Sequence, residues 1–341
     1  MEVNTSNEST ETSYNDNPFM MPLFERNVKF YVLLTLQIPS ICCTIFMLCY
    51  FKWGRLHSQI YGILIIINGL IVIIELPITL IFLHEGAIPS ENICSAWITL
   101  NYSLFFLSIA LMAWTSIERY LFIYHERVIT KHYVLLHYGP IGCIVLYGPL
   151  FYLSSIVWHT CQPFYDVHRY VCGGACYQFE LALGLIDWIG NVLSTVFITF
   201  IINIIIIMRH LVQKHRMKRA VISINRTQQW RRSLKLSAQL IAASLLYIIG
   251  WIPYTTIGLI QIFENTQELS YLLSTYFVYV PYIQTLFLPI ICLLFMPDMK
   301  HKLHSLFTES YFGKIFGHKN RVQIIMNQTN IVTGRPPLIN Q

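Results

Sequence analysis

The chain has 341 residues, of which 55% are hydrophobic and only 12% are charged, and its mean hydropathy is +0.53. A soluble domain usually carries about 25% charged residues. This composition therefore excludes a soluble globule and indicates a multi-pass membrane protein. The net charge of +6 reflects the basic residues on one side of the membrane, as described below, and does not indicate nucleic-acid binding.

Residues 1–28 are polar and acidic, and they lack the apolar core of a cleavable signal peptide. The first spanning helix is therefore expected to act as the insertion signal. Glycosylation acceptor triplets begin at Asn4 and at Asn7. We expect residues 1–29 to form an extracellular tail that carries these two glycosylation sites.

Seven apolar stretches each exceed the ~20 residues needed to cross the hydrocarbon core of a bilayer. Helices satisfy their backbone hydrogen bonds internally, and the alternating pattern of barrel strands is absent. The sequence therefore predicts an all-α fold, a bundle of seven transmembrane helices. The predicted spans are residues 30–51, 59–83, 93–117, 133–158, 181–208, 236–262 and 270–296.

The basic residues are distributed unevenly over the loops between these spans. With the N-terminus outside, all but three of the 23 Lys and Arg residues lie on the inner side, the exceptions being Arg26, Lys29 and Arg169. Inner loops of membrane proteins carry the excess of Lys and Arg. We therefore expect a plasma-membrane protein with its N-terminus outside and its C-terminus inside, whose inner basic residues meet anionic lipid headgroups.

After the seventh span, residues 296–307 alternate apolar and basic side chains at helical spacing. This pattern is typical of a helix that lies on the membrane surface. We therefore divide the chain into an extracellular tail at 1–29, a membrane domain at 30–307 that includes this short amphipathic helix, and a cytoplasmic tail at 308–341.

Four of the nine cysteines fall on the predicted outer side of the membrane, namely Cys94, Cys161, Cys172 and Cys176. An even number of cysteines in an oxidising compartment indicates two disulfides, for which three connectivities are possible. The remaining five lie within spans, where cysteine packs as a small hydrophobe.

Only two carboxylates, Glu75 and Asp187, fall inside the predicted spans. A carboxylate within a membrane is costly and marks a candidate functional site. The alternative is that each is a structural partner of a neighbouring polar side chain. No set of paired catalytic residues is present in the spans, so we expect no enzymatic activity, no cofactor and no metal.

Three motifs occur in a particular order and on particular sides of the predicted membrane. They are Cys94 at the outer end of the third span, Glu118-Arg119-Tyr120 at its inner end, and Trp251-Ile252-Pro253-Tyr254 in the sixth span. With prolines at Pro77 and Pro289, residues 30–300 resemble the rhodopsin-like family of G-protein-coupled receptors. The resemblance, which is to an orphan-type receptor similar to the peptide receptors, implies that the chain binds an extracellular ligand and activates a heterotrimeric G protein.

The resemblance assigns the conformational switch and the coupling to Glu118, Arg119, Tyr120, Trp251, Pro253 and Pro289. In the family the arginine pairs with its acidic neighbour at rest and meets the G protein when active. Pro253 removes a backbone hydrogen bond and kinks its helix, which creates a hinge. The alternatives are that Arg119 only snorkels to the headgroups and that Trp251 only packs in the core.

Some positions depart from the family pattern. The seventh span reads Leu288-Pro289-Ile290-Ile291-Cys292, which lacks both polar members of the usual Asn-Pro-x-x-Tyr. Asn68 stands where the family has an aspartate, so a sodium ion would be poorly held. Ser233 stands where a second acid often restrains the arginine, so that additional restraint is expected to be missing.

The ligand class is inferred largely by exclusion. Tyr282 stands where visual pigments carry the retinal-binding lysine, and Asn101 stands where amine receptors carry an aspartate, which disfavours a retinal Schiff base and a monoamine. Most of the 17 acidic residues lie outside, so we expect a peptide or a cationic small molecule, whose potency Glu75→Lys should reduce sharply. The predicted pocket residues are Glu75, Asn101, Tyr102, Asp187, Tyr254, Thr255 and Tyr282.

The resemblance also implies a disulfide between Cys94 and the second outer loop. We predict that Cys94 pairs with Cys172, which leaves Cys161 to pair with Cys176, and the alternative is a bond from Cys94 to Cys176. Two other functions remain open, a transporter and a decoy receptor that does not signal. A transporter is disfavoured because the spans hold few ionisable residues and show no repeated half.

Overall fold

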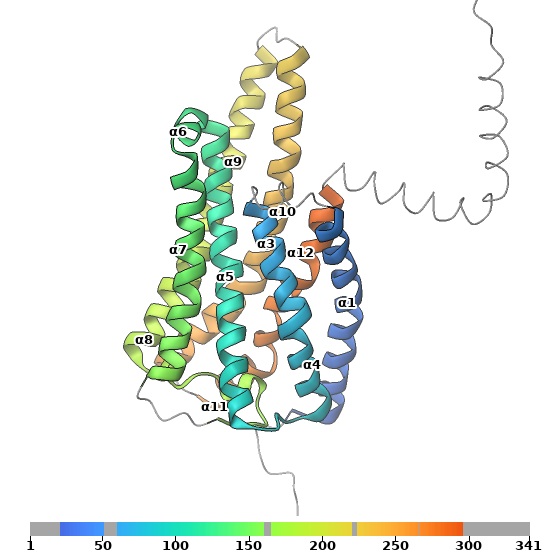
Figure 1. The fold of residues 1–341 in the computed structure, drawn as a ribbon, viewed down its shortest axis with the longest axis vertical. Helices are drawn as coiled ribbons and strands as arrows, with labels where there is room; N and C mark the ends of the chain where they lie inside the picture. The colour runs from blue at the N-terminus through green and yellow to red at the C-terminus, as the bar shows by residue number, and fades with distance from the viewer. Residues whose placement is uncertain (1–20, 51–59, 160–164, 220–223, 265, 296–341) are drawn as a thin grey trace, which may run out of the picture. The chain divides into compact units, whose positions relative to one another are not determined.

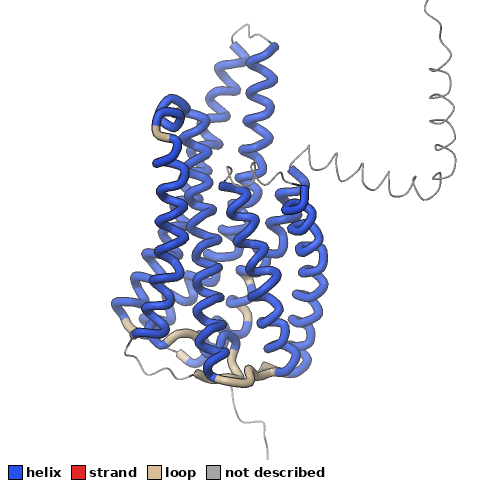
Figure 2. The backbone as a smooth tube through the Cα atoms, viewed as in Figure 1, coloured by secondary structure: helices blue, strands red, loops and turns tan. Residues whose placement is uncertain are grey.

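The computed structural model describes residues 21–50, 60–159, 165–219, 224–264 and 266–295. These residues form helices and loops, with no strand among them (Figure 2). The two glycosylation acceptors Asn4 and Asn7, the surface helix at 296–307 and the tail at 308–341 lie outside the described residues. The predictions for those parts of the chain therefore stay predictions.

The described part of the chain contains seven helical spans that are long and apolar enough to cross a membrane, as the sequence predicts. Several spans are built from two or three consecutive helical segments (Figure 1). In chain order the spans comprise α1 (Leu23–Tyr50); α3 (Ile60–Leu70), η1 (Ile71–Glu75) and α4 (Leu76–Glu85); α5 (Glu91–Tyr124); α7 (Tyr133–Leu153) and η2 (Ser154–Trp158); α8 (Leu181–Leu185), η5 (Ile186–Leu193) and α9 (Ser194–Arg219); α10 (Ile224–Phe263); and α11 (Gln267–Thr275), η6 (Phe277–Tyr279) and α12 (Pro281–Phe295).

Three short segments complete the connections between the spans. Helix α6 (Glu126–Lys131) joins α5 to α7, and the 3-10 turns η3 (Tyr170–Gly173) and η4 (Cys176–Phe179) lie in the loop before α8. Helix α6 lies at the opposite end of the bundle from α11 (Figure 1). These two ends are called here the arginine end, which holds Arg119, and the disulfide end, which holds Cys94.

Helix α5 is the central helix of the bundle. In the 18-residue apolar window of its span 78% of residues are buried, against 28% in the corresponding window of α1 and 28% in that of Tyr133–Trp158. It packs against α3, α7, α9 and α10. It also extends to Tyr124, past the predicted end at residue 117, because apolar Leu121-Phe122-Ile123 continue the helix beyond its charged pair.

Three of the spans contain a π-helical segment, in which each turn holds an extra residue: η1, η2 and η5. Such segments occur frequently at functional sites. Glu75 is the last residue of η1, and Asp187 is the second residue of η5. Pro77 follows η1 and has no N–H to continue the normal hydrogen-bond ladder, which accounts for the irregular turn there.

Candidate functional site

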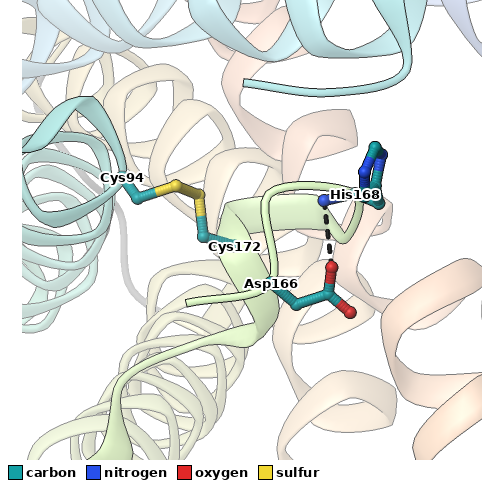
Figure 3. The surroundings of a disulfide bond; sticks show 4 residues. All are labelled: Cys94, Asp166, His168 and Cys172. Carbon is teal, nitrogen blue, oxygen red and sulfur yellow. Dashed lines mark hydrogen bonds between the residues drawn. A yellow bond between two sulfur atoms is a disulfide. The ribbon is translucent and has the colours of Figure 1, made fainter. Parts of the chain in front are cut away.

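The disulfide end is closed in part by the loop that precedes α8. Cys94, in the first turn of α5, is bonded to Cys172 in η3, with 5.8 Å between the two Cα atoms (Figure 3). This bond confirms the predicted pairing over the alternative from Cys94 to Cys176. Cys176 is also disulfide-bonded, and Cys161, its predicted partner, lies outside the described residues.

Local hydrogen bonds fold this loop around the disulfide. The amide N–H of His168 donates to the Asp166 carboxylate at 3.1 Å (Figure 3), and Arg169 forms an ion pair with the same carboxylate at 3.0 Å. Val171 and Cys172 have left-handed backbones, with φ of 45° and 50°. That conformation is uncommon for a β-branched residue, so the surrounding contacts hold the loop in a strained turn.

Two adjoining cavities lie beneath this loop, with volumes of about 510 and 1160 Å³ when the open solvent at their mouths is included. Aromatic side chains make up about half of the wall of the first cavity, which is typical of a small-molecule site. Both cavities are lined by Asn101, Tyr102, Tyr170, Gln178, Trp188, Tyr254 and Val278, and the first also by Asp187 and Trp251.

The structure brings together four of the seven predicted pocket residues, namely Asn101, Tyr102, Asp187 and Tyr254. The other three do not line these two cavities. Thr255 donates its hydroxyl to the backbone carbonyl of Trp251 at 2.8 Å. Glu75 and Tyr282 lie behind the cavity wall, bonded to each other at 2.7 Å.

Glu75 is fully buried and its Oε1 atom accepts four hydrogen bonds. The donors are the Tyr282 hydroxyl and the Asn101 amide at 2.7 Å each, the Thr79 hydroxyl at 2.9 Å, and the Trp97 indole at 3.2 Å. The four donors come from the second, third and seventh spans. The carboxylate therefore ties three helices together.

This Glu75 network reaches the loop at the disulfide end. The hydroxyl groups of Tyr170 and Tyr282 are 2.6 Å apart. Tyr170 lies two residues before Cys172. Burial, together with the nearby Glu75 charge, raises the pKa of the Tyr170 phenol well above its usual range. The phenol therefore stays protonated and remains available as a hydrogen-bond donor.

Asp187 lines the first cavity and also has neutral hydrogen-bond partners. Its Oδ1 accepts from the Tyr152 hydroxyl at 2.7 Å and the Asn191 amide at 3.2 Å, and its Oδ2 accepts from the Tyr177 hydroxyl at 2.9 Å. Burial and the Asp187 charge raise the pKa of the Tyr177 phenol well above its usual range. Within the described segments no basic side chain forms an ion pair with either intramembrane carboxylate.

Trp251 forms the floor of the cavity one half-turn before Pro253. Its indole N–H donates to the Gln284 amide oxygen at 3.1 Å, and its ring packs edge-on against Phe105 at 5.8 Å. Pro289 is buried within α12. The tryptophan therefore contacts both the central helix and the seventh span, at the helix that carries the predicted hinge.

Gly258 allows Trp188 to reach the cavity wall. A Cβ atom at position 258 would lie 2.3 Å from Cη2 of Trp188. We expect Gly258→Ala to displace this ring and to lower the free energy of unfolding by about 1–3 kcal/mol, because overpacking forces side chains from their preferred rotamers. Thermal unfolding measures the effect, with Gly190→Ala as the control because a Cβ there meets no atom within 4 Å. Equal stability of the two variants would contradict the packing described.

At the arginine end, the structure places the three residues of the Glu118-Arg119-Tyr120 motif in different surroundings. Glu118 forms a short hydrogen bond with His137 of α7. The guanidinium of Arg209 lies over the rings of two tyrosines. Its Cζ atom is 5.2 Å from the ring centroid of Tyr120 and 4.7 Å from that of Tyr124. Sequence reasoning missed both partners, because neither the lone histidine of the fourth span nor Arg209 belongs to a recognised motif.

The family comparison agrees with this geometry. The family model of the 7 transmembrane receptor (rhodopsin family) matches residues 31–291. The chain therefore belongs to the rhodopsin family of seven-transmembrane receptors, and it is a multi-pass membrane protein of the receptor type. A comparison with curated proteins gave no match.

Proposed function

We propose that this chain is a plasma-membrane receptor that binds an extracellular ligand at the disulfide end and activates a heterotrimeric G protein at the arginine end. The observation that carries the proposal is the aromatic cavity beneath the disulfide-bonded loop, set in a rhodopsin-family bundle. The N-terminus is then extracellular, as the distribution of Lys and Arg predicts.

The lining of the cavity supports a cationic small molecule or a peptide with a basic group. Asp187 is the only carboxylate among its lining residues. Within the described segments, the hydrogen-bond partners of this carboxylate are all neutral. A carboxylate without a basic partner attracts a cation, and the rings of Trp188 and Tyr254, 5.1 Å apart, add cation–π attraction.

A route from the cavity to the arginine end runs along α5 and α10. A ligand that contacts Trp251 would act on the segment next to Pro253, where the kinked helix can swing. Further along, the Ser108 and Tyr247 hydroxyls are 2.7 Å apart, and the Asn203 amide donates to Ser244 at 2.8 Å. Ligand binding would shift the population between two arrangements of these helices.

Arg119→Ala tests the coupling directly. We expect it to abolish basal and ligand-stimulated G-protein activation in cells, because the guanidinium is the group that meets the G protein. Wild type and variant are compared at equal surface expression, across several Gα subtypes and with a library of peptides and amines. Arg119→Lys is the matched control, since it keeps the charge but loses the planar fork of donors, and we expect partial activity.

A decoy receptor is the second candidate, and the apolar residues at Leu288 and Cys292 favour it. The two functions differ in one result. A decoy binds a ligand at the surface, yet its wild type activates no Gα subtype. Ion or solute flux without a G protein would instead identify a transporter.

A further inference from the structure

Glu118 is held by a residue from another helix rather than by its neighbour in the chain. Its Oε1 atom and Nδ1 of His137 form a short hydrogen bond between α5 and α7. The two side chains are buried, with 6% of Glu118 and 3% of His137 exposed. A charge-assisted bond shielded from water is stronger than one at the surface. The acid is therefore fixed on the side of α5 that faces α7.

Two tyrosines hold the imidazole in this orientation. Tyr133, one turn earlier on α7, stacks on the ring at 5.0 Å and 10°, and Tyr138 meets it edge-on at 4.5 Å. Nε2 of His137 is buried without a hydrogen-bond partner among the described residues. A proton on Nε2 would be a buried donor without an acceptor, which is costly. The proton therefore belongs on Nδ1, where it is donated to Glu118.

In the part of the chain that the structure describes, Arg119 has no close partner. Among the described residues it forms no hydrogen bond and no ion pair, and it retains only a through-space attraction to Glu118. Tyr120, the next residue, faces α9 and the guanidinium of Arg209. At the position where family members often carry a second restraining acid, the chain has Ser233.

We propose that His137 is a positioning residue that withdraws Glu118 from Arg119 and so leaves the arginine ready for the G protein before a ligand binds. This inference rests on the proposed function. Losing the histidine would free Glu118 to pair with Arg119. Removal of His137 therefore quiets the ligand-free receptor, whereas the loss of an ordinary resting-state contact would activate it.

The first test measures the coupling between residues 118 and 119 by thermal unfolding of the purified full-length receptor. Glu118→Gln, Arg119→Gln and the double variant are made with His137 present and again with His137→Phe, which keeps the ring but lacks the donor. We expect a small departure from additivity in Tm with His137, from the through-space attraction of the two charges, and a larger one with His137→Phe, because contacting residues couple more strongly than separated ones. His137→Asn, which places an amide N–H near the position of Nδ1, is expected to return the coupling to the smaller value seen with His137.

Equal coupling in the two backgrounds, or a larger coupling with His137 than with His137→Phe, would overturn the proposal. His132→Phe, at an exposed histidine before the first turn of α7, is the matched control and should behave as wild type. If the phenylalanine variant does not fold, His137→Met replaces it, because methionine adapts to irregular spaces.

The second test measures ligand-free nucleotide exchange on a G protein by the same purified receptors. We expect His137→Phe to lower the basal rate about fivefold or more, the scale of a modest coupling between sites, and Glu118→Gln to remove that difference. An unchanged or increased basal rate in His137→Phe would overturn the proposal. If wild type activates no G protein, the proposed function fails, and the unfolding measurements alone decide the role of His137.

Discussion

Replacement of Cys94 and Cys172 by alanine is expected to lower the free energy of unfolding by about 2–4 kcal/mol, the usual contribution of a disulfide. The bond joins residues 78 positions apart, so its loss frees a long loop in the unfolded chain. It also releases Tyr170 from its place against Tyr282, where the two hydroxyls are 2.6 Å apart. Thermal unfolding and the fraction of receptor at the cell surface measure the loss.

The matched control for this change is Cys143→Ala, at a free and exposed cysteine of the fourth span. We expect this control to retain the stability of wild type. The single variants Cys94→Ala and Cys172→Ala should each be as unstable as the double variant, because either one removes the same bond. A double variant with wild-type Tm would show that the loop is held by its hydrogen bonds alone.

Asp187→Asn is expected to weaken binding of a cationic agonist by about 30-fold or more. This change corresponds to about 2 kcal/mol of binding free energy, the scale of the loss when one partner of a buried charge pair is removed. The substitution removes the charge and keeps the shape. Asp187 lines the cavity, so a ligand ammonium group can approach its carboxylate. Competition binding with an agonist found in the Gα screen gives the affinity of each variant.

Glu75→Gln separates the roles of the two carboxylates. Glu75 is enclosed by four donors behind the wall of the cavity, so we expect its substitution to lower stability more than ligand affinity. The sequence alone suggested that charge reversal at Glu75 would weaken the ligand directly, and the structure favours Asp187 for that role. A greater loss of affinity in Glu75→Gln than in Asp187→Asn would reverse this assignment.

The number and positions of the spans could be predicted from sequence, because the burial of a helix in lipid requires about 20 apolar residues whatever its neighbours are. The ends were less accurate. The prediction stopped the third span at its first charge, Glu118, whereas α5 continues to Tyr124. Apolar Leu121-Phe122-Ile123 continue the helix past Glu118, whose carboxylate is buried against His137 of another helix.

The candidate site could be predicted only in part. Residues such as Asn101 and Tyr102 lie at positions that the family resemblance identifies, and they do line the cavity. The exclusion of Glu75 from the cavity depends on donors that come from three spans, which no local pattern reveals. The pairing of Glu118 with His137 joins residues 19 positions apart on two helices and is likewise a property of the packing.

The π-helical turns have a consequence for how this chain is compared with others. A regular α-helix repeats every 3.6 residues, and a π turn contains an additional residue. A relative with one residue fewer between positions 71 and 75, where η1 lies, could keep every other side chain and still present a different face to the bundle beyond that point. The direction in which side chains of the second and fifth spans face is thus set by the number of residues as well as by their identity. An alignment without gaps would equate Glu75 or Asp187 with residues that face elsewhere.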